Sequence, residues 1–452
     1  MKNKSSWSIS AVFLTSVLVA GCGGGSIQMP PPHASTWTWV SGAKALDQSG
    51  VYGTQGTASA SNMPGSRQFA VSWRDSSGHF WLFGGSGFDS TGTGAQGGLN
   101  DLWKFDGANW TWVSGSDLIN QPGVYGTMGV ASPSNVPGAR YGSISWIDKS
   151  NNLWLFGGAL LNELWKFDGA NWTWVRGSNQ AGVYGTKGTP APANVPGARG
   201  ASVSWIDGSG NLWLFGGTGL DSAGAQGDLN DLWKFDGTNW TWVSGSNVIT
   251  HPGVYGTKGT PSSSNVPGTR FQAVSWMDKS GNLWLSGGIG RDSTGTQGNL
   301  NDLWKFDGTN WIWISGSNVI AQTGVYGTKG TSSPSNVPGS RNSAVSWTDN
   351  GGNLWLFGGF GNDSTGTLSL LNDLWKFDGT NWIWMGGSQI GNGVGTYGTL
   401  GTASASNLPT SRVGAVSWID TSGNLWFFGG LGKDPTDPNT SGNLNDLWRY
   451  AP

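Results

Sequence analysis

Six arginines recur along the chain, each followed in its own repeat by an acidic residue, and these pairs are the side chains best suited to chemistry. Successive arginines are 73, 59, 71, 71 and 71 residues apart. The arginines are Arg67, Arg140, Arg199, Arg270, Arg341 and Arg412, and the acids are Asp101, Glu163, Asp231, Asp302, Asp373 and Asp446. A guanidinium group can bind an acidic ligand or pair with a carboxylate of the protein itself. Both uses stay open, although an internal pairing that orders the chain explains identical repetition better.

The second repeat departs from the others and contains the only glutamate of the chain, Glu163. The loop before it is reduced to Ala159 and Leu160, and the linker after the repeat has 23 residues where most have 26. This asymmetry predicts a notch in the surface beside Glu163, near Tyr141. Glu163 is a weak candidate for a general acid or base, because it also simply replaces the aspartate of the sister repeats.

The residue types of the chain do not indicate a metal site or a catalytic nucleophile. The only cysteine is Cys22, and the histidines His33, His79 and His251 are far apart in the sequence, so no metal site is expected. Loops such as 292–296, Asp-Ser-Thr-Gly-Thr, lack the alternating acidic ligands and closing glutamate of a calcium loop. We therefore expect no cofactor and no metal.

The elements that position these residues are short strands. Each repeat contains four segments rich in Trp, Val, Leu and Phe, as at 344–347, 211–217, 229–236 and 239–243. Turns such as Asp-Gly-Ser-Gly join the first two segments, and Asp-Gly-Thr-Asn joins the last two, both typical of hairpins. Four antiparallel strands repeated in this way predict an all-β chain and a β-propeller.

The tryptophans predict how the propeller closes. Thirty of the 31 tryptophans form sets of five per repeat, but the last repeat ends at Pro452 with only three, and the missing pair is Trp37 and Trp39. We therefore expect residues 36–40 to be the fourth strand of the last blade, which removes open sheet edges. The tryptophans are expected to pack between blades, with carbohydrate stacking as the alternative.

The Gly-Gly doublet that ends each second segment, as at Gly216 and Gly217, resembles kelch-repeat propellers. The resemblance covers the chain beyond the N-terminal 35 residues, although the 71-residue period exceeds the roughly 50 residues of a kelch unit. It implies a six-bladed propeller of four-stranded blades over residues 36–452. The blades are expected at 67–113, 140–175, 199–243, 270–314, 341–385, and 412–450 with 36–40.

The kelch resemblance also implies candidate activities. In some kelch proteins, arginines near the channel mouth bind acidic ligands, and some bacterial members are sugar mutarotases. Others resemble copper radical oxidases, whose site needs a Tyr-Cys crosslink and two histidines, which this chain does not offer. A mutarotase or epimerase would need an acid and a base over the channel, where only Glu163 and Arg140 lie in an asymmetric repeat.

The N-terminus predicts export. Lys2 and Lys4 precede an apolar run that is too short to span a bilayer, so residues 1–21 are expected to be a signal peptide. The run ends Leu-Val-Ala-Gly-Cys, which resembles the lipobox of bacterial lipoproteins and implies lipidation of Cys22. Residues 22–35, rich in Gly and Pro, then form a tether to the membrane. We expect a protein of the bacterial cell envelope, exposed at the outer membrane or cell surface.

The net charge and the loop lengths limit the kinds of partner that we expect. The formal net charge is −2 without a basic cluster, which argues against nucleic acid. Strand parity puts the long linkers and the loops after the Gly-Gly doublets on one face, and long loops commonly carry function. We expect a monomer that contacts the membrane only through its lipid and binds a glycan or a protein at this loop-rich face, without catalysis.

Overall fold

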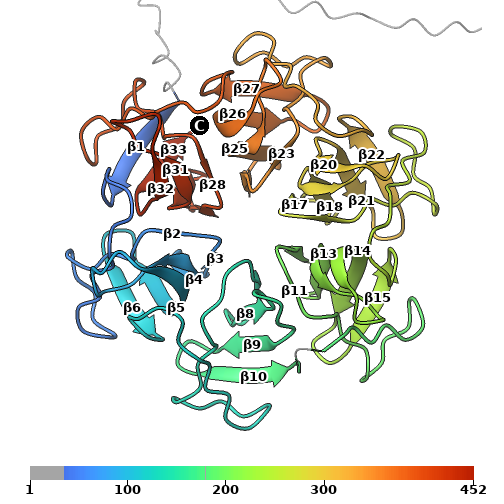
Figure 1. Cartoon of the computed structure of the whole chain (residues 1–452), viewed down its shortest axis with the longest axis horizontal. Coiled ribbons are helices and arrows are strands. Elements are labelled where there is room, and N and C mark those ends of the chain that lie inside the picture. Colours follow the sequence, from blue (N-terminus) through green and yellow to red (C-terminus); the bar gives the residue numbers. More distant parts are fainter. Residues whose placement is uncertain (1–34, 179) are drawn as a thin grey trace, which may run out of the picture. The chain divides into compact units, whose positions relative to one another are not determined.

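The computed structural model describes residues 35–178 and 180–452, and every regular element in these residues is a β-strand (Figure 1). The predicted signal peptide and Cys22 lie outside the described residues. Within the described part, no helix is long and apolar enough to cross a membrane. We number the repeats one to six by their arginines, from Arg67 to Arg412.

The first three repeats contain fourteen strands. Repeat one has β2 (Arg67–Gln68), β3 (Val71–Arg74), β4 (Phe80–Phe88), β5 (Gln96–Phe105) and β6 (Trp110–Ser114). Repeat two has β7 (Ile144–Ile147), β8 (Leu153–Phe156), β9 (Leu164–Phe167) and β10 (Trp172–Arg176). Repeat three has β11 (Arg199–Gly200), β12 (Val203–Ile206), β13 (Leu212–Leu220), β14 (Gln226–Phe235) and β15 (Trp240–Ser244).

The remaining strands include one from the N-terminal end. Repeat four has β16 (Arg270–Phe271), β17 (Val274–Met277), β18 (Leu283–Ser286), β19 (Ile289–Arg291), β20 (Gln297–Asn299), β21 (Leu303–Phe306) and β22 (Trp311–Ser315). Repeat five has β23 (Arg341–Asn342), β24 (Val345–Thr348), β25 (Leu354–Asn362), β26 (Leu368–Phe377) and β27 (Trp382–Gly386). Repeat six has β28 (Arg412–Val413), β29 (Val416–Ile419), β30 (Leu425–Phe428), β31 (Leu431–Lys433), β32 (Ser441–Asn443) and β33 (Leu447–Ala451), with β1 (Thr36–Ser41).

Each repeat forms an antiparallel sheet whose strands follow chain order, as in β12, β13, β14 and β15 of repeat three. In repeats four and six, the ends of the long hairpin form a separate three-stranded sheet. The sheet of repeat six has the order β1-β33-β30-β29, so the N-terminal strand pairs with the C-terminal one, with Trp37 opposite Tyr450. All-β organisation in four-stranded antiparallel sheets is consistent with a β-propeller.

The Gly-Gly doublet is required because neighbouring repeats approach it closely. At Gly216, where φ is 62°, a Cβ atom would stand 2.7 Å from the carbonyl oxygen of Arg270 in the next repeat. The pairing of β13 with β14 shifts register at this point. A side chain here would therefore push two repeats apart, which explains why every repeat has this doublet.

Two cycles of hydrogen bonds pass through all six repeats. In the first, a serine of each inner strand donates through Oγ to the carbonyl of the corresponding serine in the preceding repeat, at 3.1–3.3 Å. These serines are Ser72, Ser145, Ser204, Ser275, Ser346 and Ser417. Because Ser72 donates to Ser417, the first repeat contacts the last, as the ring of strands in Figure 1 shows.

The second cycle consists of backbone groups just after the arginines. Each N–H donates to the carbonyl of its counterpart in the preceding repeat, at 2.7–2.9 Å. The residues are Phe69, Gly142, Ala201, Gln272, Ser343 and Gly414, and all have φ between 53° and 66°. Four of them are not glycine, so this left-handed conformation is held against its intrinsic cost by the neighbours on either side.

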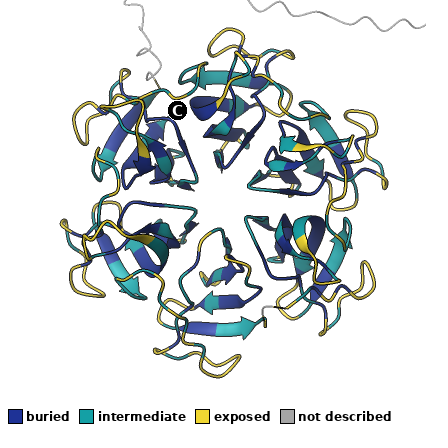
Figure 2. Cartoon of the chain, in the orientation of Figure 1, coloured by how far each residue is buried: buried dark blue, intermediate teal, exposed yellow. Residues whose placement is uncertain are grey.

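The core consists of six clusters, each lying between two adjacent repeats, and Figure 2 shows the strands largely buried and the outer loops largely exposed. Between repeats three and four, Trp205 and Trp213 pack with Leu283 and with Trp304 and Trp311. Trp304 is 0% exposed, and most other tryptophans of the repeats are buried to a similar degree. The tryptophans therefore fill the spaces between sheets, which leaves few of their ring faces for a ligand.

The path of the linkers differs from the path that the sequence predicts. Instead of only covering one face, the linker before Arg199 lies along the outer strand β15 of the repeat that it enters, through a bridge between Ala191 and Trp240. Asn194 Nδ2 adds a hydrogen bond of 3.0 Å to the Trp240 carbonyl. Corresponding bridges occur on the outer strands of the other five repeats. An outer strand would otherwise expose unpaired backbone groups, and the linker covers them.

Candidate functional site

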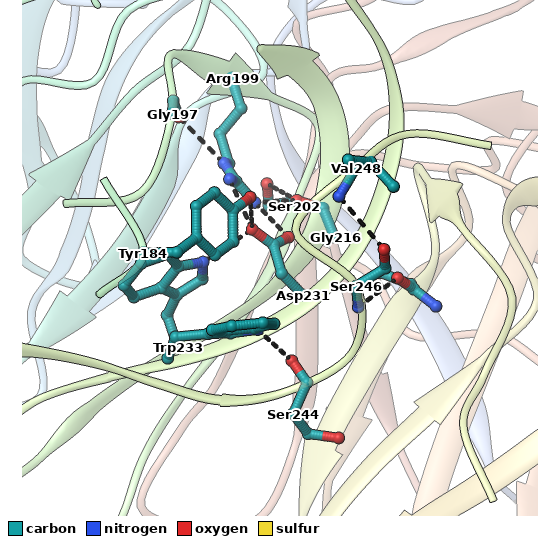
Figure 3. A network of polar contacts seen from close by, with 12 residues as sticks. Tyr184, Gly197, Arg199, Ser202, Gly216, Asp231, Trp233, Ser244, Ser246 and Val248 are labelled. Carbon is teal, nitrogen blue, oxygen red and sulfur yellow. Dashed lines mark hydrogen bonds and ion pairs between the residues drawn. The ribbon is translucent and has the colours of Figure 1, made fainter. Parts of the chain in front are cut away.

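The repeated arginine lies in a buried cluster that is the same in kind in every repeat, shown for repeat three in Figure 3. Arg199, on β11, donates from Nη1 to Asp231 Oδ1 at 2.6 Å and from Nη2 to Oδ2 at 2.8 Å. It also donates from Nε to the Gly197 carbonyl at 3.0 Å and from Nη1 to the Gly216 carbonyl at 3.1 Å. Four of the five N–H groups of the guanidinium are thus used within the protein.

The aspartate of the cluster is equally well bonded. Asp231 Oδ2 also accepts hydrogen bonds from Tyr184 Oη at 2.6 Å and from Trp233 Nε1 at 2.7 Å (Figure 3). Burial, together with the charge of Asp231, raises the pKa of Tyr184 well above its ordinary value, so the phenol stays a donor. We call this set of Arg, acid, Tyr and Trp the clamp.

All six predicted arginines and acids form such clamps. Their side chains are between 0 and 4% exposed. The cost of burying one charge without its partner explains why each arginine has its own acid and why the whole set repeats. The sequence offered the arginines as ligand-binding candidates at the channel mouth, but in the structure their side chains are at most 4% exposed and pair with the acids of the same repeats. We therefore assign them to the framework.

Sequence reasoning missed the tyrosine of the clamp. Tyr184 stands in the linker motif Gly-Val-Tyr-Gly-Thr, 47 residues before Asp231, and links the linker to the sheet. The corresponding residues are Tyr52, Tyr125, Tyr184, Tyr255, Tyr326 and Tyr397. Their intervals equal those of the arginines, and this equality was the signal that could have found them.

Glu163 occupies the acid position of the clamp in repeat two and is 2% exposed. Its Oε2 accepts from Arg140 Nη2 at 2.7 Å and from Trp165 Nε1 at 3.1 Å, and Oε1 accepts from Tyr125 Oη. Burial alone would raise the pKa of Glu163, but the charge of Arg140 and these hydrogen bonds hold it below its ordinary value. A buried carboxylate kept ionised in this way is poorly suited to give up or take up protons from a substrate.

The sequence predicts a notch in repeat two, and the structure has a shortened hairpin there. Strands β8 and β9 lack the extension that lengthens β13 and β14, and two residues, Ala159 and Leu160, make the connection with φ values of 47° and 62°. Beside them, Tyr141 is 49% exposed and Leu160 is 40% exposed. Tyr141 directly precedes Gly142 of the backbone cycle, and its carbonyl accepts from Ala159 N at 3.2 Å. We call the exposed surface of Tyr141 and Leu160 the notch, and it lies next to Gly142 of the backbone cycle.

Neither of the two described histidines belongs to a group of side chains that could hold a metal ion. His79 Nδ1 lies 2.9 Å from Asp75 Oδ2 in a hairpin, His251 lies in a linker, and His33 is outside the described residues. No group of three or more His, Cys, Asp or Glu side chains that could hold a metal ion occurs in residues 35–178 and 180–452.

Fold and site together define an all-β protein of propeller type with buried Arg-acid clamps. Among solved structures, the chain is similar to YjhT, with a TM-score of 0.49 and 15% identity over 85% of this chain and 95% of that one. It is also similar to a fungal alcohol oxidase of the AA5 family in complex with copper, with a TM-score of 0.45 and 14% identity over 89% of this chain and 77% of that one. A protein of unknown function from Dyadobacter fermentans gives a TM-score of 0.47 and 9% identity over 90% of this chain and 99% of that one.

No family model matches the sequence. No curated protein matches it either.

Proposed function

We propose that residues 36–452 form a closed six-bladed propeller of kelch type, anchored at the bacterial cell envelope through lipidated Cys22, that binds a glycan or a protein without catalysis. The hydrogen-bond cycles that return from repeat one to repeat six support closure. The binding site of this proposal is the notch of repeat two, on the loop-rich face at the mouth of the central channel.

The observation that carries the proposal is the exposure of Tyr141 and Leu160 in the repeat whose long hairpin is shortened. An exposed aromatic ring beside the channel offers a face on which a sugar or an apolar side chain can pack. The two successive left-handed residues Ala159 and Leu160 hold this surface in a conformation that costs free energy, and such strain gathers at ligand sites.

The experiment is a glycan-array and protein-capture screen of residues 35–452, followed by affinity measurements on every hit. Tyr141→Ala is expected to weaken binding at least tenfold. Val51→Ala is the matched control, because Val51 is 50% exposed but lies in a peripheral linker, and it should bind like the wild type. Equal binding by both variants would remove the notch from the proposal.

The same hits decide the catalytic alternative, a mutarotase or epimerase. Each bound sugar is followed for anomer exchange or epimerisation with the wild type and with Glu163→Gln. Product formation that Glu163→Gln abolishes while binding persists would replace our proposal with an enzyme. Anchoring is tested separately by palmitate labelling of the full chain, which Cys22→Ser should abolish.

A further inference from the structure

Three clefts with the same construction lie at successive junctions between repeats three, four, five and six. Their volumes are about 310, 470 and 610 Å³. Each is lined by the end of an outer strand, by the tip of the next linker, and by one lysine from the linker before it. The lysines are Lys187, Lys258 and Lys329, and they occupy the same position after Gly-Val-Tyr-Gly-Thr.

Two of the three ammonium groups, those of Lys187 and Lys258, are held in place by contacts with uncharged groups. Lys187 Nζ donates to the Gly245 carbonyl at 2.9 Å and lies 4.3 Å from the centre of the Trp242 ring. Lys258 does the same with Gly316 at 2.9 Å and Trp313 at 4.4 Å. Each ammonium retains two further N–H donors, and none of the three lysines forms an ion pair within the described residues.

The other repeats show that the fold does not need this charge. The corresponding residues in repeats one, two and six are Gln55, Met128 and Leu400. Met128 and Leu400 are 50 and 52% exposed, so uncharged side chains are tolerated at the same surface position. Lysine is therefore present in three consecutive repeats for a reason other than packing, and a free cation in a cleft is suited to an anion.

In the first two clefts, the lining apart from the lysine suits a sugar better than a peptide, whereas the third cleft also has the apolar side chains of Leu374, Met385 and Leu408 in its lining. Apart from the lysine, the first cleft is lined by uncharged groups and His251, including Ser244, Ser246 and Ser263. The second cleft has a similar set of serines and asparagines together with the half-buried Trp313. Hydroxyl and amide groups beside an aromatic ring match the hydroxyls and C–H faces of a pyranose, whereas a peptide would need apolar pockets for its side chains.

We infer that these three clefts form an arc of equivalent sites for the carboxylate-bearing sugars of an acidic polysaccharide. Three sites in a row suit a ligand with a repeating charge, because each bound unit raises the effective concentration of the next. The inference rests on the proposed recognition function but places a second ligand contact on the rim, away from the notch. The proposed ligands are glycan chains with a uronate or a similar acidic sugar.

The test measures binding of residues 35–452 to polygalacturonate, with neutral dextran as the control polymer. Replacing one lysine by methionine, the residue that repeat two has naturally, should weaken binding about threefold to tenfold. The triple variant Lys187→Met, Lys258→Met, Lys329→Met should lose about a hundredfold or more, because multivalent contacts compound. Conversely, Met128→Lys should strengthen binding, and rising salt should weaken it.

Several outcomes would overturn the inference. These are a wild type that does not bind polygalacturonate, a triple variant that binds it as well as the wild type, or equal binding of dextran. Tighter binding of poly-glutamate than of polygalacturonate, with the same lysine dependence, would assign the arc to an acidic peptide instead. Different variants test the two proposals: Tyr141→Ala tests the notch through the loss of its ligands, and the triple lysine variant tests the arc through the loss of polygalacturonate binding.

Discussion

Replacing Arg199 by methionine should destabilise the protein by about 3–5 kcal/mol, the usual cost of removing one partner from a buried ion pair. The structure explains the size of the effect. Asp231 is 0% exposed and would lose both charge-assisted hydrogen bonds, at 2.6 and 2.8 Å, while its charge stayed buried. Tyr184 and Trp233 would still donate to it, but neither is charged. The carbonyls of Gly197 and Gly216 would also lose a donor each.

A double-mutant cycle separates the ion pair from these other losses. Asp231→Leu alone leaves the arginine charge buried and should cost a similar amount. The double variant Arg199→Met, Asp231→Leu removes both charges and leaves the hydroxyl of Tyr184 and the indole N–H of Trp233 without an acceptor, at about 1–3 kcal/mol each. The two residues should therefore be coupled by about 3 kcal/mol.

The assay is urea unfolding followed by tryptophan fluorescence, with ligand binding measured on the same samples. Arg176→Met is the matched control, since Arg176 makes one hydrogen bond of 3.1 Å to a backbone carbonyl in an exposed setting, and it should cost less than about 1 kcal/mol. A urea midpoint of Arg199→Met equal to that of the wild type would show that the ion pair of the clamp does not stabilise the fold. If that variant also lost ligand binding, the arginine would belong to a binding site after all.

Three further predictions concern closure, packing and pH. A chain that starts after Thr36–Ser41 leaves β33 without its antiparallel partner and should unfold at lower urea throughout, whereas an unchanged midpoint would mean that this pairing contributes nothing to closure. Phe215→Ser removes a ring that is 1% exposed and whose centre lies 5.3 Å from that of the Trp311 ring, so calorimetry should show a free energy of unfolding lower by about 3–5 kcal/mol. Ser286→Ala, at the corresponding position of repeat four, is the control and should change it by less than about 1 kcal/mol. Burial alone would raise the pKa of Asp207, but hydrogen bonds from its hairpin hold this pKa below the ordinary value of 3.8. The stabilisation by Asp207 is therefore complete above that pH and is lost as the pH falls through the lower pKa of the folded state. Asp207→Asn should make the free energy of unfolding less sensitive to acid, and an unchanged pH dependence of unfolding would contradict this.

Local patterns made the strands and their turns predictable. The predicted segments at 344–347 and 239–243 match β24 and β15 to within one residue, because alternation of side chains and hairpin chemistry act over a few neighbouring residues. The Gly-Gly doublets and the pairing of Trp37 and Trp39 with the last repeat were also readable, since repetition exposes any missing member.

The candidate site was less predictable, because its partners meet only after the sheets have formed. The sequence shows that Arg199 and Asp231 repeat together, but they are 32 residues apart, and only the tertiary structure decides that they face each other in the interior rather than toward a ligand. The same holds for Tyr184, which a linker brings from 47 residues away.

The sequence by itself thus determined the repeat, with its strand segments, their turns, and the replacement of aspartate by Glu163 in repeat two. The tertiary structure decided where the side chains point. It directed the repeated arginines inward and laid the linkers along the outer strands. It also left Tyr141 and the lysines Lys187 and Lys258 at the surface. The physical reason is that burial depends on which repeats lie side by side, and a residue's own neighbours in the chain do not carry that information.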